Sequence, residues 1–183
     1  KVIPVLMGQP MSNVYQTNEY TEECSRKYGL PAFFCTDYTM SGEYLEEQVK
    51  KGGFIGLKPY LNNSPQYIPS NEIRIYDFLT PEHLEAANKN GWIVMLHIAR
   101  PGRLRDEVNL AQLMEIEEKY PNIKLIVAQV GRAYSKEDLG TAFDVLKHTE
   151  NMMFDFTANT LSLAMEQCIN AVGTKRLMFG SDL

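Results

Sequence analysis

The sequence lacks the excess of basic residues that marks proteins binding nucleic acids. It contains 183 residues, of which 18 are lysine or arginine and 23 are aspartate or glutamate, so its formal net charge is -5. Nucleic-acid-binding domains usually carry a strongly basic surface, and we therefore expect no nucleic-acid partner. The sequence also has no apolar run near the roughly 20 residues of a membrane-spanning helix, so we expect no membrane partner.

Cysteine is scarce as well. Cys24, Cys35 and Cys168 are odd in number, far apart, and set in apolar or helical stretches. This pattern fits neither a disulfide framework nor a zinc ribbon. The first ten residues also lack the apolar centre of a signal peptide, because Pro4 stands there. We therefore expect a reduced, cytoplasmic setting.

Short apolar runs, in contrast, are plentiful. Hydrophobic residues make up 44% of the chain. They gather in runs at 2–7, 32–37, 54–59, 93–98, 124–130, 153–157 and 176–182. Most of these runs are continuous rather than alternating, which is typical of β-strands buried on both faces. The sequence therefore predicts a sheet with a substantial core.

Segments with helical character separate the runs. Thr80 followed by Pro81 predicts one helix start, and Ser135 with Asp138 forms a capping-box pattern ahead of a helix that includes Leu146. Strict alternation of strand and helix predicts parallel strands joined by right-handed crossovers. The expected fold is therefore α/β, either an open doubly wound sheet or a (β/α)8 barrel.

Polar residues end the predicted strands. The carboxyl ends of parallel strands meet at one edge, and in barrels this edge carries the chemistry. The residues at that edge are Asp37, Lys58, His97, Gln129, Asp155 and Asp182. His97 and Asp182 are of the ligand types that a catalytic divalent metal requires. Each also has a structural alternative, His97 as a core histidine bonded to a backbone carbonyl and Asp182 as a helix N-cap.

The other polar residues have simpler expected roles. Lys58 is expected to extend its amino group to solvent at the strand end, with a contact to substrate or a modified metal bridge as alternatives. Asp37 and Asp155 are expected to be caps or to accept hydrogen bonds within loops. His83 and His148 lie near helix ends, where we expect both on the surface.

Arginines follow two of the predicted strands. They are Arg100, Arg103 and Arg105 after His97, and Arg132 after Gln129. A guanidinium binds a carboxylate through two parallel hydrogen bonds, so this cluster predicts a carboxylated ligand. The alternative is that some of these arginines pair with acidic neighbours such as Asp106 and Glu107.

Four segments of the sequence resemble one enzyme family. "GFIGLKPY", "IVMLHIARPG", "KLIVAQVGRAY" and "RLMFGSDL", in this order, are similar to the strand ends of the amidohydrolase-related metal-dependent hydrolases. This is the branch of the amidohydrolase superfamily that also holds decarboxylases and lactonases. The resemblance implies a distorted TIM-type (β/α)8 barrel in which the seven runs are strands 2 to 8. Residues 1–183 would then be a single domain, an interior segment of a longer protein, with the first strand and the C-terminal part missing.

The resemblance also implies roles for individual residues. A His-x-His pair on the missing first strand would bind a divalent metal together with His97 and Asp182, and zinc is the expected ion. Asp182 would also be the general base. Gln129 stands where the family usually has a histidine, and because an amide cannot take up a proton near neutral pH, it would orient water or substrate. The expected substrate-binding residues are Lys58, Tyr60, Arg100 and Arg132, below a cover formed by the connection at 60–79.

These expectations combine into one function with two alternatives. We expect a metal-dependent hydrolase that acts on a small carboxylated substrate through metal-activated water. The first alternative is a non-hydrolytic metal-dependent decarboxylase. The second is a catalytically impaired barrel, changed at Gln129, that only binds its ligand. The identity of the small anionic substrate and association into a homo-oligomer stay open.

Overall fold

Six parallel strands form one sheet in the computed structural model, which describes residues 3–10 and 13–180. The strands are β1 (Phe33–Thr36), β2 (Gly56–Pro59), β3 (Ile93–Leu96), β4 (Lys124–Val127), β5 (Met153–Asp155) and β6 (Leu177–Met178). Each strand pairs in parallel with the next along the chain. Of the predicted run at 2–7, the described part contributes one parallel bridge, from Leu6 to Ala32, rather than a named strand.

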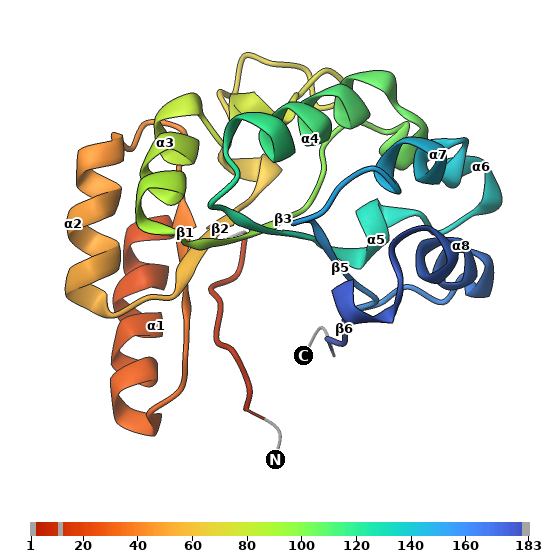
Figure 1. Cartoon of the computed structure of the whole chain (residues 1–183). Coiled ribbons are helices and arrows are strands. Elements are labelled where there is room, and N and C mark those ends of the chain that lie inside the picture. Colours follow the sequence, from red (N-terminus) through yellow and green to blue (C-terminus); the bar gives the residue numbers. More distant parts are fainter. Residues whose placement is uncertain (1–2, 11–12, 181–183) are drawn as a thin grey trace.

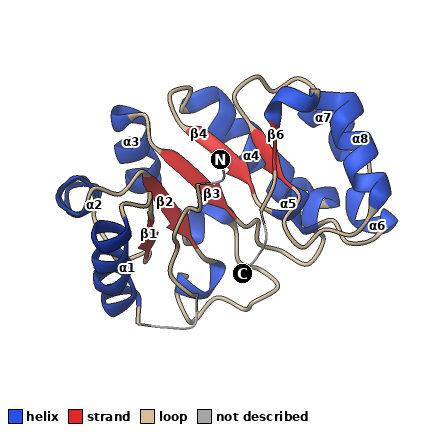
Figure 2. Ribbon diagram, turned by 90° about the horizontal axis from the view of Figure 1, so that it is seen from below, coloured by secondary structure: helices blue, strands red, loops and turns tan. Residues whose placement is uncertain are grey.

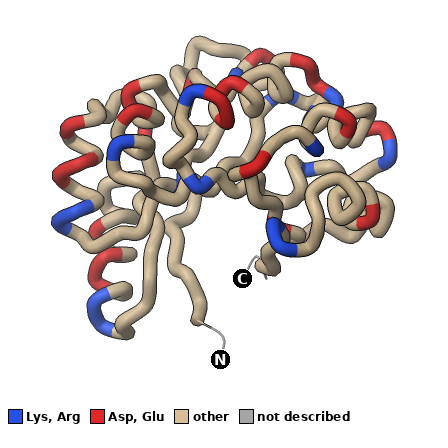
Figure 3. The backbone as a smooth tube through the Cα atoms, in the orientation of Figure 1, with Lys and Arg blue, Asp and Glu red and all other residues tan. Residues whose placement is uncertain are grey.

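Helices surround the strands on the outer side of the sheet (Figures 1 and 2). The α-helices are α1 (Val14–Tyr28), α2 (Gly42–Gly52), α3 (Pro81–Asn90), α4 (Glu107–Lys119), α5 (Gln129–Arg132), α6 (Lys136–Leu139), α7 (Ala142–Leu146) and α8 (Ser162–Val172). Short 3-10 helices lie at Leu61–Asn63, Ile75–Asp77, Arg103–Arg105 and Thr174–Arg176. Figure 3 shows that most charged residues lie on these helices and on the outer loops. In the part of the chain that the structure describes, no helix is both long and apolar enough to cross a membrane.

The strand order distinguishes the two predicted architectures. A doubly wound sheet reverses its strand order at a switch point, whereas a barrel keeps the strands in sequence order. The sheet runs from β1 to β6 without reversal. The arrangement is therefore that of a barrel wall, and it brings the carboxyl ends of all six strands to one edge.

Apolar residues from the strands and the outer helices share one core. The strand residues Leu57, Val94, Leu96, Val127 and Phe154 are completely buried, and they belong to the same cluster as Leu45, Leu84, Leu113 and Leu146 of the helices. Burial of apolar surface on this scale is the main favourable term in folding. The core accounts for the continuous apolar runs in the sequence.

The helix boundaries follow the predicted capping signals, with one exception. The Thr80 hydroxyl accepts a hydrogen bond from His83 N–H at 3.4 Å, and Ser135 forms the predicted capping box with Asp138. The helix expected to continue through Leu146 is nevertheless divided into α6 and α7. Gly140 interrupts it with a non-helical backbone (φ 52°, ψ -132°), and a β-carbon there would lie 2.8 Å from Arg105 Cβ. Glycine is needed for this close approach.

Candidate active site

The carboxyl ends of β2 to β5 bring four predicted site residues to neighbouring strands. Lys58 lies in β2, His97 directly follows β3, Gln129 follows β4 and Asp155 ends β5. Beyond the last paired residues of β3 and β4, Ala128 N–H still donates to Leu96 O at 2.9 Å. His97 and Gln129 therefore follow adjacent strands at nearly the same level of the edge formed by the carboxyl ends of β2 to β5, which we call the rim.

Lys58 and His97 form a buried contact. Lys58 Nζ lies 3.0 Å from His97 Nδ1 and donates a hydrogen bond to Met95 O at 3.3 Å. Lys58 is completely buried, so the prediction that its amino group extends to solvent is wrong. The reason is that β2 is covered on both sides, and its strand end lies inside the rim. The side-chain contact of His97 is with Lys58 rather than with the backbone carbonyl considered from the sequence.

The surroundings of His97 keep its imidazole neutral. Burial, followed by the positive charges of Lys58 and Arg132, lowers the pKa of His97 from 6.5 to about 3. A buried histidine surrounded by cations loses its proton readily because each effect disfavours the imidazolium. The ring is therefore neutral across the physiological pH range, with one nitrogen that donates and one that accepts hydrogen bonds.

Tyr60 packs over this pair. Its ring stacks on His97 with a centroid distance of 6.0 Å and an interplanar angle of 24°, and Lys58 Nζ lies 4.8 Å from the Tyr60 centroid. The Tyr60 hydroxyl donates to Gly8 O at 2.9 Å, which ties the start of the 60–79 connection to the N-terminal segment. Tyr67, farther along this connection, is 85% exposed. Tyr60 thus contacts Lys58 and His97, whereas Tyr67 faces solvent.

A left-handed turn follows β4. The φ values of Gln129, Val130, Gly131 and Arg132 are 55°, 48°, 61° and 57°. The strand predicted over 124–130 therefore ends at Val127. For residues other than glycine this conformation costs roughly 1–2 kcal/mol each. Gly131 is required on packing grounds too, because a β-carbon there would lie 2.4 Å from Leu104 Cδ2.

Hydrogen bonds from three directions hold the turn in place. Gln129 N–H donates to Asp155 Oδ2 at 3.1 Å, Asn159 Nδ2 donates to Gln129 O at 3.1 Å, and Arg103 Nη1 donates to Arg132 O at 2.9 Å. Strained backbone of this kind persists only where its surroundings determine it, and it is common at functional sites.

Two aspartates act within loops, as predicted. Asp155 is 2% exposed, and its carboxylate accepts from Gln129 N–H and from Thr157 N–H, the latter at 2.7 Å. Asp37 Oδ1 accepts from the backbone N–H and the hydroxyl of Thr39 at 3.0 and 2.6 Å. Asp155 is therefore a support for the turn that carries Gln129.

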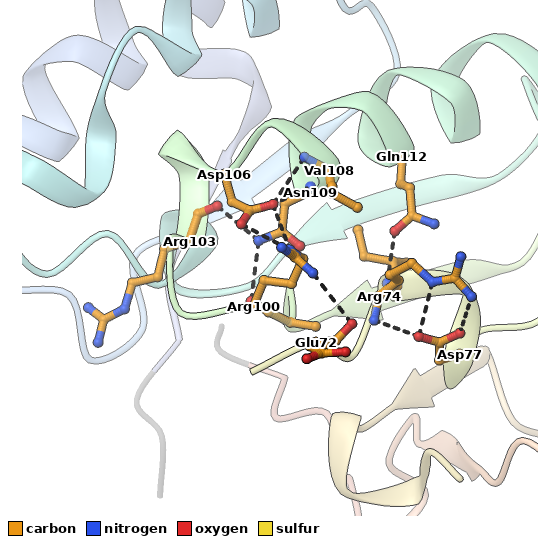
Figure 4. A network of polar contacts seen from close by, with 11 residues as sticks. Glu72, Arg74, Asp77, Arg100, Arg103, Asp106, Val108, Asn109 and Gln112 are labelled. Carbon is orange, nitrogen blue, oxygen red and sulfur yellow. Dashed lines mark hydrogen bonds and ion pairs between the residues drawn. The ribbon is translucent and has the colours of Figure 1, made fainter. Parts of the chain in front are cut away.

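The arginines differ in what they contact. Figure 4 shows Arg100 in a network in which its Nε donates to both carboxylate oxygens of Asp106 at 2.9 Å and its Nη1 donates to Glu72 O at 3.4 Å. Arg103 pairs with Asp138, its Nη1 lying 2.8 Å from Oδ2. The ion-pair alternative is thus confirmed for Arg100. Within the described ranges 3–10 and 13–180, the Arg132 guanidinium has no hydrogen bond or ion pair, and its charge acts on His97.

A contact of Gln129 was not predicted from the sequence. The Tyr134 hydroxyl donates a hydrogen bond to Gln129 Oε1, and the Arg103 guanidinium carbon lies 4.7 Å from the Tyr134 ring centroid. The sequence offered one signal for this contact. Tyr134 ends the segment "QVGRAY", and Gly131 between it and Gln129 allows the chain to turn back.

The remaining predicted ligands lie elsewhere or outside the described part. Asp182 falls in residues 181–183, outside the described residues. Among the residues that are described, no three histidine, cysteine, aspartate or glutamate side chains come together as a metal-binding group. The prediction that His83 is on the surface is wrong, because it is completely buried and its Nε2 donates to Met40 O at 2.8 Å. His148 is exposed as expected.

Solved structures share this fold. The chain is similar to a "probable 2-pyrone-4,6-dicarboxylic acid hydrolase" from Acinetobacter baumannii with citric acid bound, with a TM-score of 0.67, 15% identity, and coverage of 98% of this chain and 67% of that one. It is similar to a dihydroxybenzoic acid decarboxylase from Polaromonas sp. JS666 with bound manganese and the inhibitor 2-nitroresorcinol, with a TM-score of 0.62, 15% identity, and coverage of 92% and 64%. It is also similar to an uncharacterized TIM-barrel protein from Bordetella bronchiseptica, with a TM-score of 0.63, 13% identity, and coverage of 98% and 64%. The chain thus spans between 64% and 67% of the length of these proteins, and its six-stranded sheet is that of part of a TIM-type (β/α)8 barrel, as predicted.

Sequence comparison identifies the family. No curated protein matches the sequence. The family model described as "Amidohydrolase" matches residues 7–183, a range that contains all four motifs named above and the rim residues of β2 to β5. The chain therefore belongs to the amidohydrolase family.

Proposed function

We propose that this chain is part of a metal-dependent enzyme that acts on a small carboxylated substrate at the rim formed by β2 to β5. The proposal rests on two side chains at this rim. The imidazole of His97 is neutral, and the nearby guanidinium of Arg132, whose charge acts on His97, has no ion-pair partner among the described residues. The solved neighbours support the substrate class, since one was solved with citric acid and another is a dihydroxybenzoic acid decarboxylase.

The chemistry of His97 fits a divalent metal ion. Metal binding requires a neutral imidazole, and the pKa of His97, about 3, keeps the ring in that form. We propose His97 and Asp182 as two of the ligands. The resemblance favours zinc, while the decarboxylase neighbour was solved with manganese. A metal ion bound here would polarise a substrate oxygen and activate a water molecule.

Arg132 is the proposed partner of the substrate carboxylate. A guanidinium can bind a carboxylate through two parallel hydrogen bonds, which fixes the orientation of the substrate as well as its charge. Lys58 and Tyr60 would position the substrate beside His97. Arg100 is a second candidate, but its Nε is already bound to Asp106, so a substrate contact would use its other nitrogens.

Hydrolysis needs a proton acceptor, and we propose the Asp182 carboxylate for that role. The amide of Gln129 cannot take a proton from water near neutral pH, so its part would be to hold the substrate in place. Because hydrolysis then depends on a single carboxylate, the reaction should fail in an Asp182→Asn variant.

Decarboxylation is the second proposed reaction, and Gln129 is the observation that favours it. Loss of carbon dioxide needs no base to activate water. An amide in place of the family's histidine therefore impairs decarboxylation less than hydrolysis. Neighbours that act on dihydroxybenzoate and 5-carboxyvanillate are decarboxylases.

Product analysis of the intact protein distinguishes the two reactions. The protein, supplied with zinc or manganese, is incubated with 2-pyrone-4,6-dicarboxylate or 2,6-dihydroxybenzoate in water enriched in heavy oxygen. Hydrolysis places the heavy isotope in the product, whereas decarboxylation releases carbon dioxide.

Arg132→Met should lower kcat/KM at least about tenfold, the effect of losing one charge-assisted hydrogen bond. Arg26→Met, on the exposed surface of α1, should leave it unchanged.

Binding and turnover of the two compounds also distinguish an active enzyme from a barrel that only binds its ligand. Carboxylate binding without turnover of either compound would support the catalytically impaired barrel. A metal-loaded protein that binds neither compound would contradict the proposed substrate class.

The cysteines support the proposed cytoplasmic setting. All three are free, and burial raises the pKa of Cys35 to about 11 and that of Cys168 to about 12. Both are therefore protonated thiols packed in the interior, which is usual for reduced proteins.

A further inference from the structure

The surroundings of Lys58 Nζ suit an ammonium group. Met95 O lies 3.3 Å from Nζ, and the centroid of the Tyr60 ring lies 4.8 Å from it. A backbone carbonyl can only accept a hydrogen bond, and the face of an aromatic ring attracts a cation. Lys58 is completely buried, and a charge in the interior needs such partners around it. At His97 Nδ1, 3.0 Å away, the same ammonium meets a ring nitrogen.

An ammonium group at this position determines which ring nitrogen of His97 carries the proton. An ammonium has three N–H donors and no lone pair, so it can only donate to Nδ1. Nδ1 is then the accepting nitrogen. Because the imidazole is neutral, its single proton is on Nε2. The one lone pair of the ring is therefore at Nδ1, the atom that Lys58 already contacts.

A metal ion needs that same lone pair. Zinc binds the unprotonated nitrogen of a histidine at about 2.0–2.1 Å. The lone pair of Nδ1 cannot serve both the ion and an N–H of Lys58, and Nε2 offers no lone pair while it carries the ring proton. Two positive charges in one buried place also repel each other. The ion and the ammonium therefore exclude each other at His97.

We propose that the Lys58 ammonium takes the place of the metal ion at His97 in the metal-free protein, so that metal binding requires Lys58 to leave Nδ1. This inference rests on the proposed function, because it takes His97 as a metal ligand. The site holds its ion less tightly than its ligands alone would allow, since each ion that binds displaces a hydrogen bond of a charged group. Lys58 thus sets the metal affinity without being a ligand.

The tautomer of the His97 ring tests the contact without any change to Lys58. Nitrogen NMR of the intact protein, freed of metal by a chelator, identifies the protonated ring nitrogen. The proton should be on Nε2 in the wild type. It should also be there in Arg132→Met, because the guanidinium of Arg132 acts on His97 through its charge. A proton on Nδ1 in the wild type would overturn the inference, because Lys58 would then be the acceptor.

Zinc titration of the intact protein, followed by competition with a coloured chelator, tests the exclusion itself. Lys58→Met removes the donor and keeps an apolar side chain of similar length. This variant should bind zinc at least about tenfold more tightly than the wild type, the effect of one hydrogen bond to a charged group. Arg132→Met is the matched control, since it removes one positive charge near His97 but leaves the contact at Nδ1, and its gain should be smaller. Weaker zinc binding in Lys58→Met, or equal gains in the two variants, would overturn the inference.

The two measurements together separate this inference from the proposed function. If the wild type binds zinc and its His97 ring carries the proton on Nδ1, the proposed function stands and the role of Lys58 is wrong. If neither the wild type nor Lys58→Met takes up zinc, His97 is not a ligand and both are wrong.

Discussion

At the scale of single residues, burial decides what each polar side chain can do. Lys58 and His83 are both completely buried, although their positions near element ends suggested exposed side chains. Each is held by a contact to a residue far away in the sequence, Lys58 to His97 and His83 to Met40. Their chemistry therefore depends on neighbours that only the fold supplies.

Removing the charge of Lys58 should raise the pKa of His97. Burial is the largest cause of the low value, and the Lys58 charge is the next. In Lys58→Met, we expect the pKa to rise above about 3 yet to stay below 6.5, because the burial persists. An NMR titration of the His97 ring measures this. Lys124→Met, at the opposite end of the strands, is the control, and an equal pKa in both variants would show that Lys58 carries no charge at this contact.

His83 should make the protein less stable in mild acid. Burial lowers its pKa in the folded state, while the hydrogen bond to Met40 O and, after it, the charges of Glu82 and Asp37 act in the other direction. A group with a lowered folded-state pKa binds its proton more readily when unfolded, so the stability it supports is present above the unfolded pKa near 6.5 and is lost as the pH falls below it. Nδ1 has no partner among the described atoms, so its protonation would bury an unpaired donor.

Denaturant unfolding between pH 7 and pH 5 measures the contribution of His83. In His83→Gln the free energy of unfolding should depend less on pH than in the wild type, since the amide can still donate to Met40 O but cannot be protonated. His148→Gln, at an exposed position, should retain the wild-type slope. If the two variants show the same pH dependence, His83 is not its source.

At the scale of elements, the left-handed turn at Gln129–Arg132 is the feature that sets the site apart from a plain barrel rim. The apolar residues of 124–130 continue past the strand end, so their pattern alone suggested a longer strand. The turn is determined by Asp155, Asn159 and Arg103, which lie on other elements. It directs Gln129 and Arg132 away from the path of the strand.

Gly131→Ala should destabilise the protein more than an equivalent change elsewhere. The β-carbon would meet Leu104 Cδ2 at 2.4 Å, in addition to the cost of a left-handed alanine. Gly29→Ala is a matched control, because Gly29 has a φ of 63° and open space around its β-carbon position. We expect a loss of about 1 kcal/mol for Gly29→Ala and a further ~1–3 kcal/mol for Gly131→Ala in denaturant unfolding. Equal losses would mean that the packing around the turn yields easily.

At the scale of the whole molecule, the sequence predicted the fold better than the site. Continuous apolar runs, helix caps and the four motifs were sufficient for the parallel barrel and for the family, because these signals are local and repeated along the chain. The site depends on contacts between residues distant in sequence, such as Asp155 with Gln129, and on a backbone conformation that Val130 would not suggest. The hydrogen bond between Tyr134 and Gln129 was missed because it depends on a turn that no hydrophobic pattern predicts.

The metal content of the intact protein after dialysis against zinc or manganese tests the proposed metal site. We expect about one tightly held ion per chain in the wild type and in His148→Gln, and at least about tenfold weaker retention in His97→Gln, because one of the proposed ligands is lost. A wild-type protein that takes up neither metal, or a His97→Gln variant that holds the ion as tightly as the wild type, would contradict a metal-dependent site at this rim.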